Sequence, residues 1–130
     1  MNKIFWIADD DPEDRMIIKE AFEENCYDEK LVFFEDGEKV LLKFKEKGNE
    51  YYPSLLILDL NMPKINGLEL LSTLKQDAKT KNIPIVIFST SRNNLDKEKV
   101  LKLGADDFIT KPFSFDMMIK ITKELIERYG

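Results

Sequence analysis

The sequence predicts an α/β fold in which helices cover both faces of a five-stranded parallel sheet. Five short apolar runs recur along the chain, and segments with helical spacing of apolar residues separate them. Most runs are apolar at consecutive positions, which indicates strands that are buried on both faces. Five successive β-α units of this kind join parallel strands through right-handed crossovers, so the sheet is expected to be doubly wound.

The strands are expected at the five apolar runs, which are Ile4–Ala8, Leu31–Phe34, Leu55–Leu58, Ile85–Phe88 and Phe108–Thr110. Three helices are predicted from apolar stripes, whose members are Ile17, Ile18, Ala21 and Phe22 in the first, Leu68, Leu71 and Leu74 in the third, and Phe115, Met118, Ile119, Thr122, Leu125 and Ile126 in the last. The second and fourth helices are predicted at Glu38–Lys47 and Leu95–Leu103.

Residues with capping preferences mark several helix ends. Asp11 is the expected N-cap of the first helix, because Pro12 and two acids follow it. Asn66-Gly67 is expected to open the third helix, and Gly104 is expected to end the fourth.

Length and composition narrow the class of protein. At 130 residues the chain is expected to form one domain, residues 1–130, with no output domain, because the last helix runs to the end. The hydrophobic fraction of 43% and the charged fraction of 35% are typical of a soluble globular protein. The net charge of −5 argues against nucleic acid as a direct partner. No apolar run suits membrane insertion, and the lone Cys26 favours a reducing, cytoplasmic location.

Polar side chains follow four of the predicted strands. In an open parallel sheet, ligands bind outside the carboxyl ends of the strands, so these side chains are expected to converge on one edge. They are Asp9, Asp10 and Asp11 after the first strand, Asp59 after the third, Ser89, Thr90 and Ser91 after the fourth, and Lys111 after the fifth.

The three consecutive aspartates need a cation if they are held close together. Two carboxylates about 4 Å apart repel by roughly 4 kcal/mol at an effective dielectric constant near 20. Asp11 suits helix capping, which leaves Asp9 and Asp10 beside Asp59 as a hard oxygen site that fits Mg²⁺. With the ion screening its charge, Asp59 could attack phosphorus and form an acyl phosphate.

The remaining groups suit the same chemistry. Phosphoryl transfer depends mainly on positioning and on neutralising the three equatorial oxygens. The Lys111 ammonium and the Ser89 hydroxyl could each bind one oxygen. The chain contains no histidine, so a phosphoryl group carried on histidine would have to come from another protein.

At this point the chain resembles the response-regulator receiver domains of two-component signalling, over nearly its whole length. The segments that carry the resemblance are ADDDPED, LLILDLNMPKINGLELL, IPIVIFSTS and LGADDFITKPF. The resemblance implies a flavodoxin-like sheet of order 2-1-3-4-5, similar to the chemotaxis regulators. The Ser89-Thr90-Ser91 stretch also resembles the stand-alone regulators that pair with bacterial phytochromes.

The resemblance also assigns roles to individual residues. It implies that Asp59 is the phosphorylation site, Asp10 a direct Mg²⁺ ligand and Asp9 a ligand through water, with the backbone carbonyl of Asn61 completing the set. It further implies that Ser89 is the switch hydroxyl, Lys111 the phosphate-binding lysine and Phe108 the switch aromatic. The Lys111–Pro112 peptide bond is expected to be cis.

The chain departs from the family pattern at three positions. Serine stands at position 89 where threonine is commoner, which changes the chemistry little. Thr90 is larger than the alanine or glycine often found there, and it is expected to crowd the approach to the site. Phe108 replaces a tyrosine, which removes a phenol but keeps the ring.

The function implied is that of a phosphoacceptor signalling protein and not of an enzyme acting on other substrates. A sensor histidine kinase or a phosphotransfer protein would supply the phosphoryl group. Phosphorylation would draw Ser89 inward, let Phe108 turn in, and change the surface around the fourth helix, fifth strand and fifth helix. A separate downstream protein, or a second copy in a phosphorylation-dependent homodimer, would bind that surface. Phe113, Phe115 and Met117 lie near it in sequence, and some of them are expected in the core.

Three alternatives share parts of this pattern. A flavin-binding module has the same architecture, but three acids after the first strand would repel the flavin phosphate. An aspartyl-phosphate hydrolase uses Asp-x-Asp, whereas this chain has Asp59-Leu60-Asn61, and asparagine cannot act as a general acid. A degenerate receiver kept as an interaction surface would have lost an acid, hydroxyl or lysine, and none is lost.

Overall fold

The computed structural model describes residues 3–27, 30–46 and 52–130. The strands are β1 (Phe5–Ala8), β2 (Leu31–Phe34), β3 (Leu55–Leu58), β4 (Ile85–Ser89) and β5 (Asp107–Thr110). The helices are α1 (Pro12–Glu24), α2 (Gly37–Glu46), α3 (Gly67–Gln76), α4 (Asn94–Lys102) and α5 (Phe115–Tyr129). Strands and helices alternate along the chain, as the sequence predicts.

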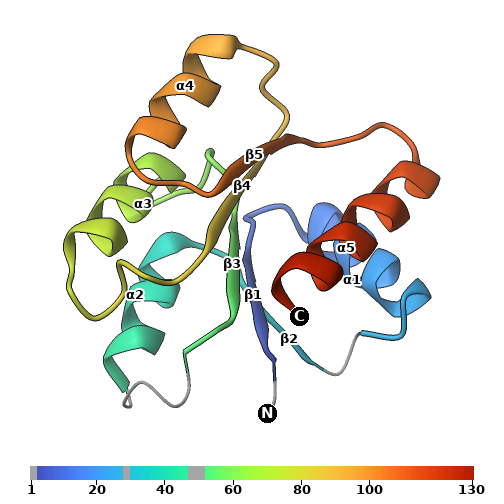
Figure 1. The fold of residues 1–130 in the computed structure, drawn as a ribbon, viewed down its shortest axis with the longest axis horizontal. Helices are drawn as coiled ribbons and strands as arrows, with labels where there is room; N and C mark the ends of the chain where they lie inside the picture. Colours follow the sequence, from blue (N-terminus) through green and yellow to red (C-terminus); the bar gives the residue numbers. More distant parts are fainter. Residues whose placement is uncertain (1–2, 28–29, 47–51) are drawn as a thin grey trace.

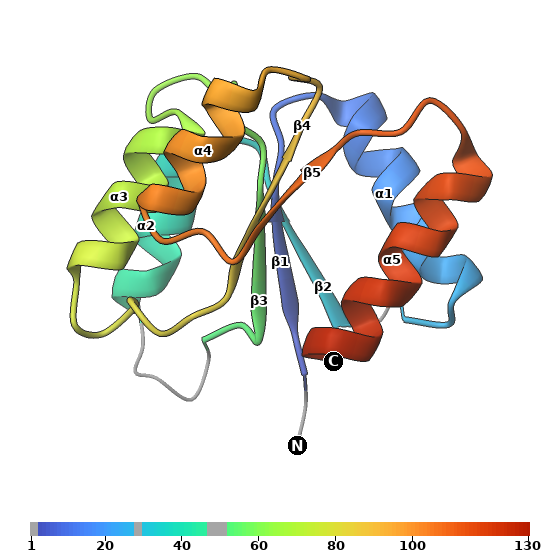
Figure 2. The same cartoon turned by 45° about the horizontal axis from the view of Figure 1, so that its top comes forward.

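All strand pairs are parallel, and the sheet order is β2-β1-β3-β4-β5, which confirms the expected topology. Helices α1 and α5 cover one face of the sheet, and α2, α3 and α4 cover the other (Figures 1 and 2). The order β2-β1-β3 reverses the direction of winding between β1 and β3. Ligands of such sheets bind outside the carboxyl ends at this reversal.

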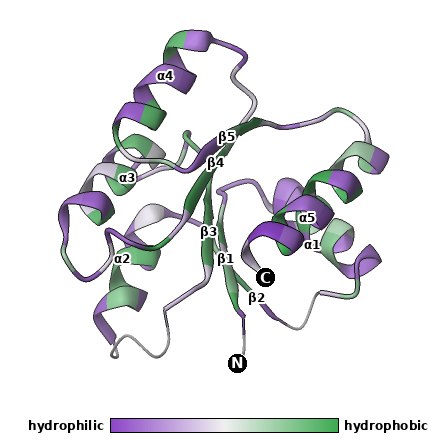
Figure 3. Cartoon of the chain, viewed as in Figure 1, coloured by the Kyte–Doolittle hydropathy of each residue, from purple (hydrophilic) through white to green (hydrophobic). Residues whose placement is uncertain are grey.

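The sheet separates two apolar cores. Within β1, the Phe5 and Ile7 side chains belong to the core beneath α1 and α5, whereas Trp6 and Ala8 belong to the core beneath α2, α3 and α4. All four are buried, which explains why the strand is apolar at consecutive positions. Figure 3 shows mostly hydrophobic strands between helices that carry both hydrophobic and hydrophilic residues.

The predicted caps are present. The Asp11 carboxylate accepts a hydrogen bond from the Glu13 N–H at 2.9 Å, and the Asn66 side chain accepts one from the Glu69 N–H at 2.9 Å. Gly104 follows α4 with a φ of 108°, a left-handed conformation that favours glycine. These caps fix where α1 and α3 leave the carboxyl edge of the sheet.

Gly67 lets α3 begin directly beside the end of β3. Its N–H donates to the Leu60 carbonyl at 2.9 Å. A Cβ atom on residue 67 would lie 2.4 Å from the Asp59 carbonyl oxygen, closer than two such atoms can approach. The loop that follows Asp59 is therefore held tightly against the start of α3.

The predicted boundaries differ from the observed ones by one residue at several ends. Strand β1 begins after Ile4, β4 continues to Ser89, and β5 begins at Asp107. Helix α4 is displaced by one residue toward the N-terminus, and α2 begins at Gly37. The predicted end of α2 at Lys47 lies outside the described residues.

Some apolar side chains expected in the core are exposed instead. Ile17 and Phe115 are each about two-fifths exposed, because they line a depression of about 190 Å³ between α1 and the segment that leads into α5. Phe113 is 94% exposed, and Met117 is also exposed, so none of the three apolar residues near the start of α5 is fully in the core. Within the described part of the chain, no helix is both long enough and apolar enough to cross a membrane.

Candidate functional site

The carboxyl ends of β1 and β3 bring two acids side by side. Ala8 pairs with Leu58, so Asp9 and Asp59 are the next residues on neighbouring strands. The Asp59 N–H donates to the Ala8 carbonyl at 3.0 Å, which continues the ladder by one residue. Both side chains are buried, with residue exposures of 1% for Asp9 and 8% for Asp59.

Three carboxylates at this edge could hold a cation. One oxygen each from Asp9, Asp10 and Asp59 lies within 4.8 Å of the other two. Asp10 is exposed, so the cluster opens to solvent on one side. Oxygen donors of this kind, with room left for water, suit a hard divalent ion such as Mg²⁺ or Mn²⁺. The residues present therefore fit a divalent metal.

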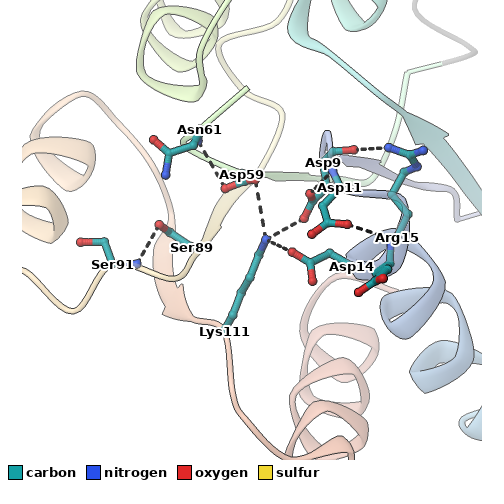
Figure 4. Close-up of polar contacts among 10 residues, drawn as sticks. Asp9, Asp11, Asp14, Arg15, Asp59, Asn61, Ser89, Ser91 and Lys111 are labelled. Carbon is teal, nitrogen blue, oxygen red and sulfur yellow. Dashed lines mark hydrogen bonds and ion pairs between the residues drawn. The ribbon is translucent and has the colours of Figure 1, made fainter. Parts of the chain in front are cut away.

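Lys111 reaches this cluster from β5, the strand two places away from β3. Its Nζ donates to Asp9 Oδ2 at 2.8 Å and lies 3.7 Å from Asp59 Oδ2 (Figure 4). The Lys111 N–H donates to the Ser89 carbonyl at 2.7 Å, which anchors the start of the side chain. The sequence prediction that Asp9, Asp59 and Lys111 converge is confirmed.

Asp14 is a member of the site that sequence reasoning missed. Its Oδ2 accepts a second hydrogen bond from Lys111 Nζ, also at 2.8 Å. The sequence explains Asp14 fully as an acid in the first turn of a helix, so it gave no reason to look further. Only the placement of α1 against the end of β5 reveals this second contact.

The site perturbs the acid strength of its members. Burial raises the pKa of Asp59 to about 6, the charges of Asp9 and Asp10 add to this rise, and Lys111 opposes it. Burial also raises the pKa of Asp9, against the effect of its hydrogen bond from Lys111. Burial alone would lower the pKa of Lys111, but its hydrogen bonds to Asp14 and Asp9 outweigh this and raise it. Negative charge is therefore in excess here, as a cation-binding site requires.

Ser89 is fully buried at the end of β4, and its hydroxyl is linked to two other elements through Ser91. Ser89 Oγ accepts a hydrogen bond from the Ser91 N–H at 3.1 Å. Ser91 Oγ donates to Asp96 Oδ2 in α4 at 2.6 Å, and the Ser91 carbonyl accepts from the Thr110 hydroxyl of β5 at 3.3 Å. Within the described residues, no hydrogen bond joins the Ser89 hydroxyl to Asp59.

The loop after β3 also contributes to the site. The Asn61 N–H donates to Asp59 Oδ1 at 3.3 Å, which places the Asn61 backbone beside the carboxylate (Figure 4). Asn61 and Thr90 line a depression of about 380 Å³ together with Asp10, Asp59 and Lys111. Thr90 therefore lies beside the site, and its expected effect on access stays a prediction.

One expectation drawn from the resemblance differs from the structure, and another stays untested. The Lys111–Pro112 peptide bond is trans, the isomer that an X-Pro bond prefers by roughly 0.5–1 kcal/mol. Phe108 is buried, at 8% exposure, and packs in the core beneath α2, α3 and α4, so whether its ring moves on phosphorylation stays a prediction. A tyrosine here would need a partner for its hydroxyl, whereas phenylalanine has no polar atom that opposes burial.

Comparison with known proteins decides the family. A family model described as the response regulator receiver domain matches residues 5–123. The chain belongs to this family. Receiver domains of this type are signalling modules that interact with histidine kinases, and they are not enzymes acting on external substrates.

The receiver relatives include two of similar length. The chain is 29% identical over 126 residues to the probable methanogenesis regulatory protein FilR2 of Methanothrix harundinacea, covering 95% of this chain and 81% of FilR2. It is 28% identical over 124 residues to the response regulator Rcp1 of Synechocystis, covering 93% of this chain and 84% of Rcp1.

Solved receiver structures agree with the fold. The phosphorylated cyanobacterial phytochrome response regulator RcpA superposes with a TM-score of 0.88 at 30% identity, covering 99% of this chain and 94% of RcpA. The Mn²⁺-bound form of Rcp1 superposes with a TM-score of 0.85 at 29% identity, covering 98% of this chain and 97% of Rcp1. A divalent metal bound in Rcp1 agrees with the acidic cluster of this receiver.

Proposed function

We propose that this receiver accepts a phosphoryl group on Asp59 from a histidine kinase or a phosphotransfer protein, with Mg²⁺ as its cofactor. The observation that carries the proposal is the position of Asp59, whose carboxylate lies between two further acids and the Lys111 ammonium. A carboxylate with the adjacent depression open to solvent can be reached by a phosphodonor.

In the reaction, an Asp59 carboxylate oxygen forms a bond to phosphorus while the bond from phosphorus to the donor breaks. The product is an acyl phosphate, and the donor leaves with the electron pair of the broken bond. The raised pKa of Asp59 keeps part of it protonated near pH 6, so the reactive carboxylate predominates above that pH. The Lys111 ammonium lies close enough to Asp59 to interact with the negative charge that develops on the phosphoryl oxygens. The Ser89 hydroxyl lies at the end of β4, the strand next to β3.

Asp10, Asp59, the Asn61 carbonyl and, through water, Asp9 are the proposed Mg²⁺ ligands. When bound, the ion would supply positive charge that lowers repulsion between the phosphoryl oxygens and the acids. The chain's own contribution is to hold three carboxylates close together despite their repulsion. Asp9 is fixed for this purpose, because its Oδ1 accepts from the Asp11 N–H at 3.0 Å and its carbonyl accepts from Arg15 at 2.7 Å.

The signal is proposed to leave through α4, β5 and α5. A phosphoryl group adds a charge of about −1.5 to −2 and acceptor oxygens that attract the Ser89 hydroxyl. Movement of Ser89 would disturb its bond with Ser91, which is bonded in turn to Asp96 of α4 and Thr110 of β5. Because Phe108 is already inside, this route does not require its ring to turn inward.

The receiver is proposed to act as a single domain over residues 1–130 in the cytoplasm. Its output would then be a separate downstream protein or a homodimer that forms on phosphorylation.

Intact mass spectrometry tests the proposal. Acetyl phosphate and Mg²⁺ should add the mass of one phosphoryl group to the wild-type protein. The Asp59→Asn variant should gain none, and EDTA should prevent the gain in the wild type. An adduct of equal amount in Asp59→Asn would contradict the proposal.

A further inference from the structure

The position of Lys111 points to a role for Asp14, the acid in the first turn of α1. We propose that Asp14 is a positioning residue that holds the Lys111 ammonium beside α1 and releases it when Lys111 engages a phosphoryl group on Asp59. This inference rests on the proposed function of Asp59, and it adds a residue through which phosphorylation is regulated.

Lys111 is closer to Asp14 than to the proposed phosphoacceptor. Its Nζ lies 2.8 Å from Asp14 Oδ2 and 2.8 Å from Asp9 Oδ2, but 3.7 Å from Asp59 Oδ2. An ammonium group carries three protons, and these two carboxylates occupy two of them. The third proton is left for Asp59, but a phosphoryl group there that draws the ammonium closer has to draw it away from Asp14 or Asp9.

Burial decides which of the two partners can release Lys111. The Lys111 side chain is 9% exposed and the Asp9 side chain 2%, so separating this pair would leave a buried carboxylate with its backbone hydrogen bond from Asp11 but without its cation. Such an uncompensated buried charge is strongly unfavourable. The Asp14 side chain is 31% exposed, so water can replace Lys111 as its hydrogen-bond partner. Asp14 is therefore the partner that Lys111 can leave.

A matched control lies next to Asp14 in the sequence. Glu13 is exposed, belongs to the same helical turn, and makes no ion pair with Lys111 among the described residues. Glu13→Gln and Asp14→Asn each remove one negative charge from the first turn of α1, so they change the long-range electrostatic potential at the site similarly. Only Asp14→Asn removes the contact with Lys111.

Beryllofluoride imitates a phosphoryl group, so its affinity for the protein reports how strongly Asp14 competes for the Lys111 ammonium. With saturating Mg²⁺, fluorine NMR titration should show that Asp14→Asn binds beryllofluoride about fivefold more tightly than wild type, the factor that a partly exposed ion pair is worth. Asp14→Glu, which keeps the carboxylate, should restore most of the wild-type affinity. Glu13→Gln should differ little from wild type.

A second measurement needs neither metal nor phosphate analogue. In the free protein, the Lys111 ammonium protons should exchange slowly with water, and Asp14→Asn should accelerate this exchange in lysine ¹⁵N NMR spectra. Unchanged exchange, or equal tightening by Glu13→Gln and Asp14→Asn, would overturn the role of Asp14. A wild-type protein that binds no beryllofluoride would instead overturn the proposed function of Asp59, and the exchange measurement would still test the Asp14 contact.

Discussion

Lys111 Nζ lies 3.7 Å from Asp59 Oδ2, although β4 separates the strands that these two residues follow. The long lysine side chain spans this distance and ends among buried carboxylates. Without a second cation, the ammonium is shared among Asp9, Asp14 and Asp59. One close cation therefore faces several acids at this site.

The first prediction concerns stability against pH in metal-free buffer. The pKa of Asp59 is raised to about 6 in the folded protein, above the ordinary value of about 3.9 expected after unfolding. Between these values the folded state binds more protons, so the Asp59 contribution to stability falls as pH rises from about 4 to about 6. The difference between a pKa of about 3.9 and one of about 6 corresponds to about 3 kcal/mol of unfolding free energy.

The Asp59→Asn substitution removes the carboxylate whose burial destabilises the folded protein at neutral pH. The unfolding free energy of this variant should exceed that of wild type by about 2–3 kcal/mol at pH 7 and by much less at pH 4, because the wild-type carboxyl is neutral there. Urea denaturation in EDTA at both pH values measures the two differences. Equal differences at pH 4 and pH 7 would show that Asp59 is not destabilised by its charge.

The second prediction concerns Lys111→Met, which keeps the apolar stem and removes the ammonium. Asp9 and Asp59 would lose the cation nearest to them, so the unfolding free energy at pH 7 should fall by about 3 kcal/mol. The loss should be smaller at pH 5, where Asp59 is mostly protonated. Lys111→Arg, which keeps a positive charge, serves as the control. A Lys111→Met variant as stable as wild type at pH 7 would mean that Lys111 does not offset these acids.

The third prediction concerns the divalent ion. Because Mg²⁺ would bind only the folded state, its addition should raise the melting temperature, with about 2.7 kcal/mol of stabilisation at a concentration of 100 times Kd. Asp10 is exposed and close to the buried acids, so Asp10→Asn should lose most of this effect with little change in metal-free stability. Glu13→Gln should respond as wild type does. Full Mg²⁺ stabilisation of Asp10→Asn would remove Asp10 from the ligand set.

The fourth prediction concerns the route of the signal. Beryllofluoride with Mg²⁺ should shift the NMR resonances of Ser91 and α4, because Ser91 links Ser89 to Asp96. Ser91→Ala keeps its N–H but removes the hydroxyl, and should reduce the shifts in α4 severalfold. In fluorophenylalanine-labelled protein, the Phe108 resonance should keep one buried environment throughout. A Phe108 resonance that moves from an exposed to a buried environment would show that the ring turns inward and takes part in the switch.

Most of the fold was predictable because its signals are local. Each signal depends on a few neighbouring positions. The signals are five runs of consecutive apolar residues, the Asp11 and Asn66 caps, and the polar residues that follow the strands. The parallel topology then brings Asp9, Asp59 and Lys111 to one edge without further information. This is why these three residues could be named before their distances were known.

The remaining features depend on how distant segments pack. Asp14 contacts Lys111 only because α1 lies beside the end of β5, and no local pattern distinguishes it from an ordinary acid in a first helical turn. Phe108 is inside because its ring meets an apolar core, although the resemblance alone implied a ring that turns inward later. Phe113 is exposed beside Arg92, whose guanidinium lies 4.9 Å from its ring centre.

Chemical trapping tests the central claim most directly. After treatment with acetyl phosphate and Mg²⁺, borohydride reduces an aspartyl phosphate to homoserine, and peptide mass spectrometry locates the altered residue. We expect homoserine at position 59 in the wild-type protein and no trapped residue in Asp59→Asn. Homoserine at another aspartate in the wild type, with Asp59 unchanged, would contradict the account.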